Sequence, residues 1–95
     1  MNDKQPLPAP SGLSVNAMPG SVNQVTFGSA GGDINYEIWR RHGDTVDWYL
    51  HATISEPLFS DAEVKPGQYY EYKVRAVLGD SVSEFSPSAV AYGAE

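Results

Sequence analysis

The sequence predicts an all-β domain, a seven-stranded antiparallel sandwich, and three observations lead to this prediction. First, the stretch from Pro66 to Val77 has apolar side chains at every second position, namely Tyr70, Tyr72, Val74 and Ala76. A period of two places these side chains on one face of an extended chain, as in a strand with one buried face. Second, further alternating segments follow one another, with turn residues recurring about every 8 to 12 positions. Third, a helical repeat would scatter the apolar residues of the first stretch around the whole circumference of a helix, and its β-branched and aromatic residues favour a strand.

Length, charge and composition limit the possible classes of protein. The chain has 95 residues, 41% of them hydrophobic, and no cysteine, so we expect one domain whose core is stable without disulfides. A formal net charge of −6 opposes binding to nucleic acid or to an anionic membrane. No apolar run reaches the roughly 18 residues of a membrane span, and the N-terminus has no hydrophobic signal segment. We expect residues 1–10 to be a proline-rich linker or tail and residues 11–95 to be the single domain, monomeric in isolation.

The first half of the chain predicts three strands separated by glycine-rich turns. They are Leu13–Ala17, Ser21–Phe27 and Ile34–Arg41. Alternation assigns to the core Leu13 and Val15, then Val25 and Phe27, then Ile34, Tyr36 and Ile38. A Pro19-Gly20 turn closes the first strand, and the loop Gly28–Asp33 follows the second.

The second half predicts four more strands. They are Trp48–Ile54, Pro57–Ser60 with Phe59 buried, the strand that follows Pro66-Gly67, and Phe85–Tyr92. In Trp48–Ile54 the expected inward residues are Leu50, Ala52 and Ile54, and the outward ones are Tyr49, His51 and Thr53. A one-residue shift in register would exchange these two rows. The segment Leu78–Ser83 predicts a hairpin around Gly79-Asp80, and Pro87 is compatible only with an edge or a bulge.

Several segments, read together and in order, resemble a fibronectin type III domain over residues 8–92. They are Pro8-Ala9-Pro10-Ser11-Gly12-Leu13-Ser14-Val15, Val25-x-Phe27, Tyr36-Glu37-Ile38-Trp39-Arg40, Phe59-x-Asp61, Val64-x-Pro66-Gly67-x-x-Tyr70-x-Tyr72-x-Val74-x-Ala76-Val77 and Ser83-Glu84-Phe85-Ser86-Pro87-Ser88. The resemblance implies an immunoglobulin-like β-sandwich. The third strand and the paired tyrosines are most similar to bacterial and phage members. Family members usually have tryptophan where Phe27 stands, so Tyr36 and Tyr72 are expected to help fill the core.

The resemblance also implies a structural role for Tyr70 near the start of the sixth strand. In such sandwiches this tyrosine points inward, and its hydroxyl bonds to the backbone of the preceding connection. That connection is the segment from Asp61 to Lys65. We therefore expect a tyrosine corner at Tyr70 rather than at Tyr69.

The sequence contains no pattern typical of a catalytic or cofactor site. The twelve acidic residues are scattered, and the histidines His42 and His51 have no Cys or His neighbour at metal-ligand spacing. No Gly-x-Ser-x-Gly segment is present, and the glycines of residues 28–32 are not followed by Lys-Ser or Lys-Thr. We expect no catalytic residue, no metal and no cofactor, and therefore not an enzyme.

One surface is a candidate for contact with a partner. If the third and sixth strands pair, the outward rows place Trp39 and Arg41 beside Lys73 and Arg75, and Tyr49 and Tyr92 join from flanking strands. This strip predicts either a docking face for a neighbouring domain or a platform for sugar rings. A third possibility is that Trp39 stacks on the stems of Lys73 or Arg75 and contributes only to stability.

The resemblance implies a non-catalytic module of a larger secreted, cell-surface or phage-tail protein, and so an extracellular location. Such a module acts as a spacer and as a domain-contact or protein-interaction unit, with the neighbouring domains as partners. The alternative is a carbohydrate- or receptor-binding module that uses the Trp39 strip or the loops Gly28–Asp33 and Leu78–Ser83. No Arg-Gly-Asp occurs in the second of these loops, so the integrin-binding role of some relatives does not carry over.

Overall fold

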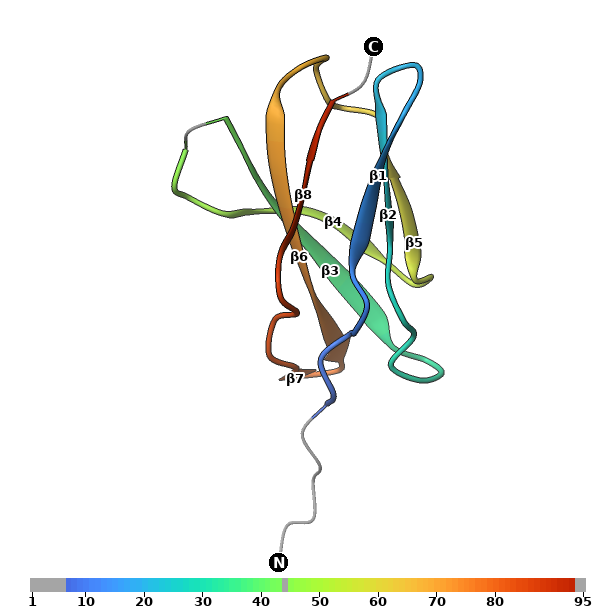
Figure 1. Ribbon diagram of the computed structural model, residues 1–95. Coiled ribbons are helices and arrows are strands. Elements are labelled where there is room, and N and C mark those ends of the chain that lie inside the picture. Colours follow the sequence, from blue (N-terminus) through green and yellow to red (C-terminus); the bar gives the residue numbers. More distant parts are fainter. Residues whose placement is uncertain (1–6, 44, 94–95) are drawn as a thin grey trace, which may run out of the picture.

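The computed structural model describes residues 7–43 and 45–93, which form the predicted all-β sandwich (Figure 1). The strands are β1 (Ser14–Met18), β2 (Val22–Thr26), β3 (Asn35–His42), β4 (Tyr49–Ile54), β5 (Leu58–Asp61), β6 (Tyr69–Leu78), β7 (Ser81–Val82) and β8 (Ala89–Tyr92). Within these residues no helix is long and apolar enough to cross a membrane. The predicted fold class is confirmed.

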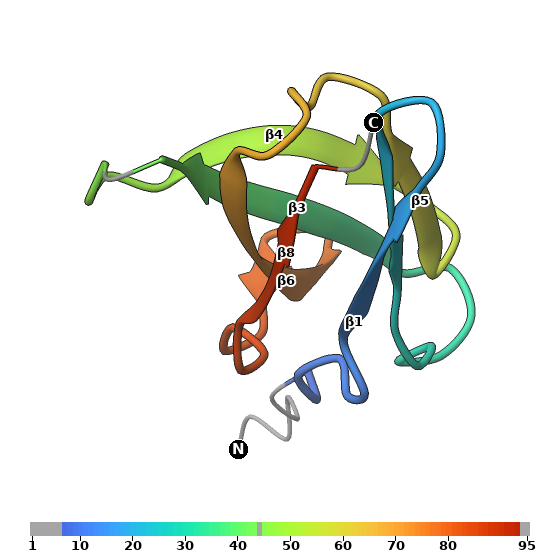
Figure 2. The same ribbon diagram turned by 45° about the horizontal axis from the view of Figure 1, so that its top comes forward.

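The strands form two antiparallel sheets that pack face to face (Figures 1 and 2). One sheet has three strands in the order β1-β2-β5. The other has five strands: β4, β3 and β6 lie side by side, and both β7 and β8 pair with β6. The hairpin of β3 and β4 extends beyond the other strands (Figure 2). The expected pairing of the third strand with the sixth is present over the whole length of β3.

The predicted last strand, Phe85–Tyr92, is shortened to β8, which begins at Ala89, because two serine side chains bind β6 in the segment between β7 and β8. The Val74 N–H donates to Ser86 Oγ at 3.1 Å, and the Ala76 N–H donates to Ser83 Oγ at 2.8 Å. The N–H groups of Ser83 and Ser86 in turn donate to the carbonyls of Ala76 and Val74. The backbone N–H and carbonyl groups of Val74 and Ala76 in β6 thus have hydrogen-bond partners although no regular strand lies beside them. Pro87, which has no N–H, fits this irregular segment.

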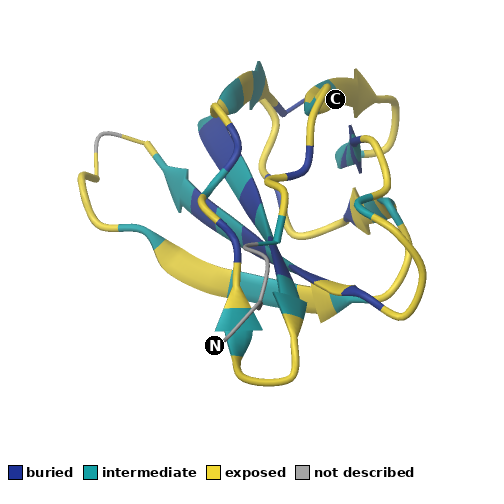
Figure 3. Ribbon diagram, turned by 90° about the horizontal axis from the view of Figure 1, so that it is seen from below, coloured by how far each residue is buried: buried dark blue, intermediate teal, exposed yellow. Residues whose placement is uncertain are grey.

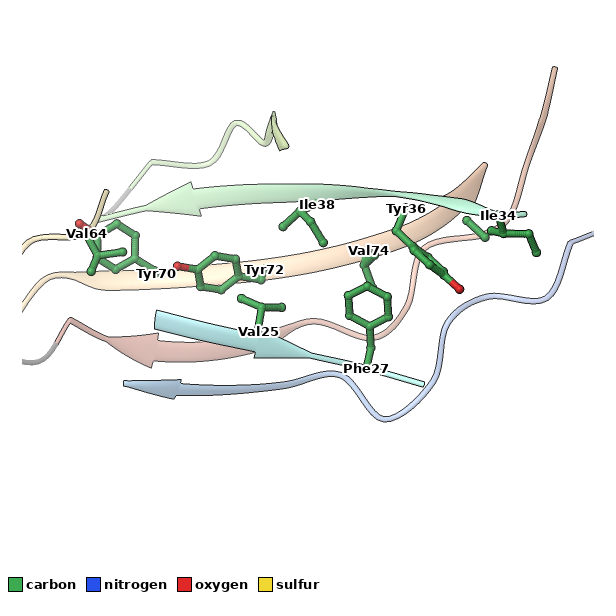
Figure 4. Packing of buried hydrophobic residues seen from close by; sticks show 10 residues of the cluster. Val25, Phe27, Ile34, Tyr36, Ile38, Val64, Tyr70, Tyr72 and Val74 are labelled. Carbon is green, nitrogen blue, oxygen red and sulfur yellow. The ribbon is translucent and has the colours of Figure 1, made fainter. Parts of the chain in front are cut away.

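The core lies between the two sheets and consists mainly of the rows predicted from alternation, although Leu13, Val15 and Phe59 are only partly buried (Figures 3 and 4). Its buried members are Val25, Phe27, Ile34, Tyr36, Ile38, Val64, Tyr70, Tyr72, Val74 and Ala76. The rings of Phe27 and Tyr36 pack edge to face with centroids 4.9 Å apart, so Tyr36 helps to fill the core beside Phe27 as expected. The Tyr36 hydroxyl also accepts the Ala30 N–H at 2.8 Å, which ties the loop at residues 28–33 to the core.

The predicted orientation of β4 is correct for one half of the strand and wrong for the other. Ala52 and Ile54 pack against the core, but Leu50 is 47% exposed, whereas the His51 side chain is only 8% exposed. The cause is a shift in register: Ile38 pairs with Ala52, but the next residue, Trp39, pairs with Leu50. The extra residue, His51, reverses the alternation, as a β-bulge does.

Tyr70 binds the connection that precedes its strand. The Lys65 backbone N–H donates to the Tyr70 hydroxyl at 2.7 Å, within the segment expected from the resemblance. The same connection holds the end of β8, since the Gly67 N–H donates to the Gly93 carbonyl and the Gly93 N–H to the Gln68 carbonyl. Tyr70 therefore fixes both a loop and the point where the chain leaves the sandwich.

Replacing Tyr70 by phenylalanine should lower the free energy of unfolding by about 1 to 3 kcal/mol, because the Lys65 N–H loses its partner. The measurement is urea unfolding of Tyr70→Phe at neutral pH. Tyr92→Phe is the matched control, since Tyr92 is 60% exposed and should tolerate the change. Equal midpoints for Tyr70→Phe and the unaltered chain would show that this hydroxyl contributes nothing.

Candidate functional site

The outer face of the five-stranded sheet brings together four of the residues expected to form an interaction surface. The register of β3 and β6 places Glu37 opposite Arg75, Trp39 opposite Lys73 and Arg41 opposite Glu71. Alternate residues of each strand face the core, so these six side chains share the outer face. Trp39, Arg41, Lys73 and Arg75 thus lie together as the alternation predicts.

Two aromatic residues that the sequence did not indicate complete this surface. The Lys73 Nζ atom lies 4.4 Å from the ring centroid of Trp48 and 4.0 Å from that of Phe85. The Arg75 guanidinium lies 4.9 Å from the Phe85 ring and 5.6 Å from the Trp39 ring. The Arg41 guanidinium lies 5.0 Å from the Trp48 ring. We refer to these residues as the cation–aromatic face, which consists of Trp39, Arg41, Trp48, Lys73, Arg75 and Phe85.

Two carboxylates neutralise the arginines of this face. Arg75 Nε donates to Glu37 Oε1 at 2.7 Å, and the Trp39 indole N–H donates to the same oxygen at 3.0 Å. Burial raises the pKa of Glu37, but these hydrogen bonds and the Arg75 charge outweigh it and hold that pKa below its ordinary value. Glu71 accepts from Ser88 and from Arg41, and these bonds likewise lower its pKa. Lys73 forms no ion pair with any described residue.

The other two residues expected on this surface lie apart from it. Tyr49 is on the inner side of the bulge, where its hydroxyl accepts from Arg40 Nε at 2.6 Å, so its expected outward orientation is wrong. Tyr92 is on the outer face but near the end of the sheet, and its ring packs against Tyr69 with centroids 5.5 Å apart. Neither ring contacts a member of the cation–aromatic face.

A second polar cluster lies inside the sandwich and was not expected from the sequence. Asp61, at the end of β5, is fully buried and accepts from Arg40 Nη1 and the Tyr72 hydroxyl, each at 2.6 Å. Its other oxygen accepts the Glu63 N–H at 3.0 Å and lies 3.1 Å from His51 Nε2. Arg40 continues the inward row of Ile34, Tyr36 and Ile38, so strict alternation along β3 does contain a signal for its burial.

The bonds to Asp61 fix its charge. Burial alone raises the pKa of the Asp61 carboxyl, but the bonds from His51, Tyr72, Glu63 and Arg40 outweigh burial and hold the pKa far below its ordinary range. Burial and the neighbouring Asp61 charge raise the pKa of Tyr72 above its usual value, so its hydroxyl keeps the proton that it donates. Both carboxylate oxygens of Asp61 accept hydrogen bonds from neighbouring groups of the protein. Asp61 therefore cross-links the two sheets. No group of three or more metal-binding side chains occurs among the described residues.

Comparison with solved structures identifies the architecture. An Fn3-like protein from Clostridium thermocellum superimposes with a TM-score of 0.82 and 25% sequence identity, over 96% of this chain and 97% of that one. The chain folds as a fibronectin type III domain. A multidomain segment of titin gives a TM-score of 0.78 at 17% identity over 92% of this chain, and this chain spans only 32% of that structure. No family model and no curated protein sequence matches the chain.

For this fibronectin type III fold, acid should remove the contribution of Asp61. Because the folded-state pKa lies below the unfolded value, the stabilisation is complete above about pH 4 and is lost as the pH falls below it. The variant Asp61→Asn should lose about 3 to 5 kcal/mol at pH 7, since the Arg40 charge stays buried without its partner. It should also lose part of the acid dependence between pH 4 and pH 2.

The measurement is urea unfolding at several pH values. Asp80→Asn is the matched control, because Asp80 is exposed in the turn between β6 and β7. If the free energy of unfolding of Asp61→Asn depended on pH in the same way as that of the unaltered chain, the charge of Asp61 would not contribute to the acid dependence.

Proposed function

We propose that this fibronectin type III domain is a non-catalytic module of a larger secreted, cell-surface or phage-tail protein, and that it acts as a spacer with a fixed direction. The observation that carries the proposal is the path of the chain. It enters the sandwich at one end, near β7, and leaves at the opposite end, beyond β8 (Figure 1). Domains joined before and after such a module are held apart by the length of the sandwich.

The point where the chain leaves the sandwich is held on both sides. Gly93 is buried, pairs with Pro66 and exchanges backbone hydrogen bonds with Gly67 and Gln68. A Cβ atom at Gly93 would collide with the Lys65 carbonyl oxygen, so only glycine fits without a shift of this loop. Since the Tyr70 hydroxyl binds the Lys65 N–H, the direction of the outgoing chain is tied to the core.

The incoming chain is also attached. Leu7 packs against the core, Pro10 is buried, and the Gly28 N–H donates to the Ser11 carbonyl at 2.6 Å. These contacts lie in or beside the proline-rich segment, whose prolines restrict the backbone. A module with both connections attached transmits orientation as well as distance, which a flexible linker does not.

The solved neighbours support the modular part of the proposal. The titin kinase structure with its flanking domains has a TM-score of 0.78 and 17% identity over 94% of this chain, which spans 18% of that structure. Domains of this fold there are parts of longer chains. The extracellular or phage setting rests on the sequence resemblance alone, and the bacterial setting rests also on the similarity to the Clostridium protein.

The carbohydrate-binding alternative has less support. Flat sugar rings need an open aromatic face, but cations already lie over the rings of Trp39 and Trp48. The loop at residues 28–33 is tied back by Tyr36 rather than presented as an open binding loop. We therefore prefer a protein-contact role over a sugar-binding one.

The proposal can be tested in the parent protein by electron–electron distance measurements between a spin label in this module and one in the domain that follows. We expect a narrow distance distribution. Gly93→Ala should broaden it, because the outgoing chain must move away from Lys65. Gly32→Ala is the control, since a Cβ there meets open space. A distribution in the unaltered protein as broad as that of a glycine–serine linker of equal length would contradict the spacer role.

A further inference from the structure

One cation of the cation–aromatic face forms no ion pair within the part of the chain that the structure describes. Three cations, Arg41, Lys73 and Arg75, lie on the outer face of β3 and β6. Among the described residues, the carboxylates that pair with these cations are Glu37 and Glu71, and each is bonded to an arginine. This surplus is unusual in a chain that has twelve acidic residues, six basic ones and a net charge of −6.

The unbalanced cation is Lys73, and aromatic rings rather than a carboxylate hold it in place. Its ammonium group lies between Trp48 and Phe85, at 4.4 and 4.0 Å from their ring centroids. A cation–π contact at a partly exposed site restrains the ammonium without cancelling its charge. A partner's carboxylate can therefore pair with Lys73 without first breaking an ion pair and with little loss of side-chain freedom.

Two exposed apolar side chains lie on the same outer face, on the strands that flank β3 and β6. Leu50, opposite Trp39, is 47% exposed, and Val90, opposite Glu71, is 50% exposed. Aromatic and arginine side chains with apolar neighbours are typical of the centre of protein–protein interfaces. The rings cannot serve as open sugar platforms, because cations already contact them.

We propose that the cation–aromatic face docks an acidic protein surface, in which a carboxylate flanked by apolar side chains pairs with Lys73. This rests on the protein-contact role preferred above and names the partner by its chemistry. The carboxylate meets the ammonium between the two rings, and the apolar neighbours cover Leu50 and Val90. The charge of Lys73 repels a basic surface. The face therefore discriminates between neighbouring domains by the sign of their surface charge.

The test uses the 95-residue chain and a blocked tripeptide, leucine–glutamate–leucine, followed by NMR. Trp39 and Trp48 are the two tryptophans of the chain, so both indole N–H signals report on this face. We expect both signals to shift saturably with the glutamate peptide. Leucine–glutamine–leucine and leucine–lysine–leucine, which lack the carboxylate, should have little effect. Raising the salt from about 0.02 to about 0.5 M should weaken binding, because it screens the pair.

Variants then localise the charge. Lys73→Met keeps an unbranched apolar stem and should weaken peptide binding by about threefold or more, the scale of a partly exposed ion pair. Lys73→Arg should restore it, and Lys65→Met, at an exposed lysine of the connection before β6, should bind as the unaltered chain does. Unfolding midpoints measured for each variant show that the fold is retained.

Four results would overturn the proposal. They are unmoved indole signals, equal binding of the lysine peptide, shifts caused by cellohexaose but not by the glutamate peptide, and shifts that depend only on protein concentration, as in self-association. None of these bears on the distance distribution in the parent protein. The spacer function and the docking face can therefore fail separately.

Discussion

The ion pair between Arg40 and Asp61 is the constraint on which the interior of this domain depends. Arg40 belongs to the five-stranded sheet and Asp61 to the three-stranded one, so the bond crosses the layer between them. A buried charge pair of this kind is costly unless every remaining donor and acceptor is satisfied. Here Asp61 also receives Tyr72 and the Glu63 N–H and contacts His51, which turns a costly pair into a cross-link with fixed geometry.

The cross-link explains the bulge in β4 and the orientation of one buried amide. The bulge in β4 turns His51 and Tyr49 inward, where one meets Asp61 and the other accepts from Arg40 Nε. The orientation of Asn23 follows as well: the Tyr72 hydroxyl has a single proton, which it gives to Asp61, so Asn23 Nδ2 must be the donor in its bond to Tyr72. If β4 alternated regularly, Tyr49 would point outward, and the Arg40 guanidinium would lose this hydrogen-bond partner.

Alternation along the chain predicted the core rows of β3 and β6, because those central strands are paired on both sides and keep a strict period of two. It failed at Leu50 and His51, since a bulge depends on the partner strand and leaves no mark in the local sequence. The members of the outer face on β3 and β6 could be predicted for the same reason as the core rows. Trp48 and Phe85 could not, because both were expected to begin strands but lie outside β4 and β8, where periodicity carries no information.

The structure divides its charged groups between two tasks that can vary independently. Inside, removal of one partner leaves a buried charge uncompensated, so that cluster is constrained by stability. On the outer face, each cation–π contact contributes only about 0.5 to 1 kcal/mol at a partly exposed site. Changes at Lys73 or Phe85 therefore cost a small part of the stability of the domain while altering the charge and shape that a partner meets. The fold can thus keep one interior and present different outer faces to different neighbours.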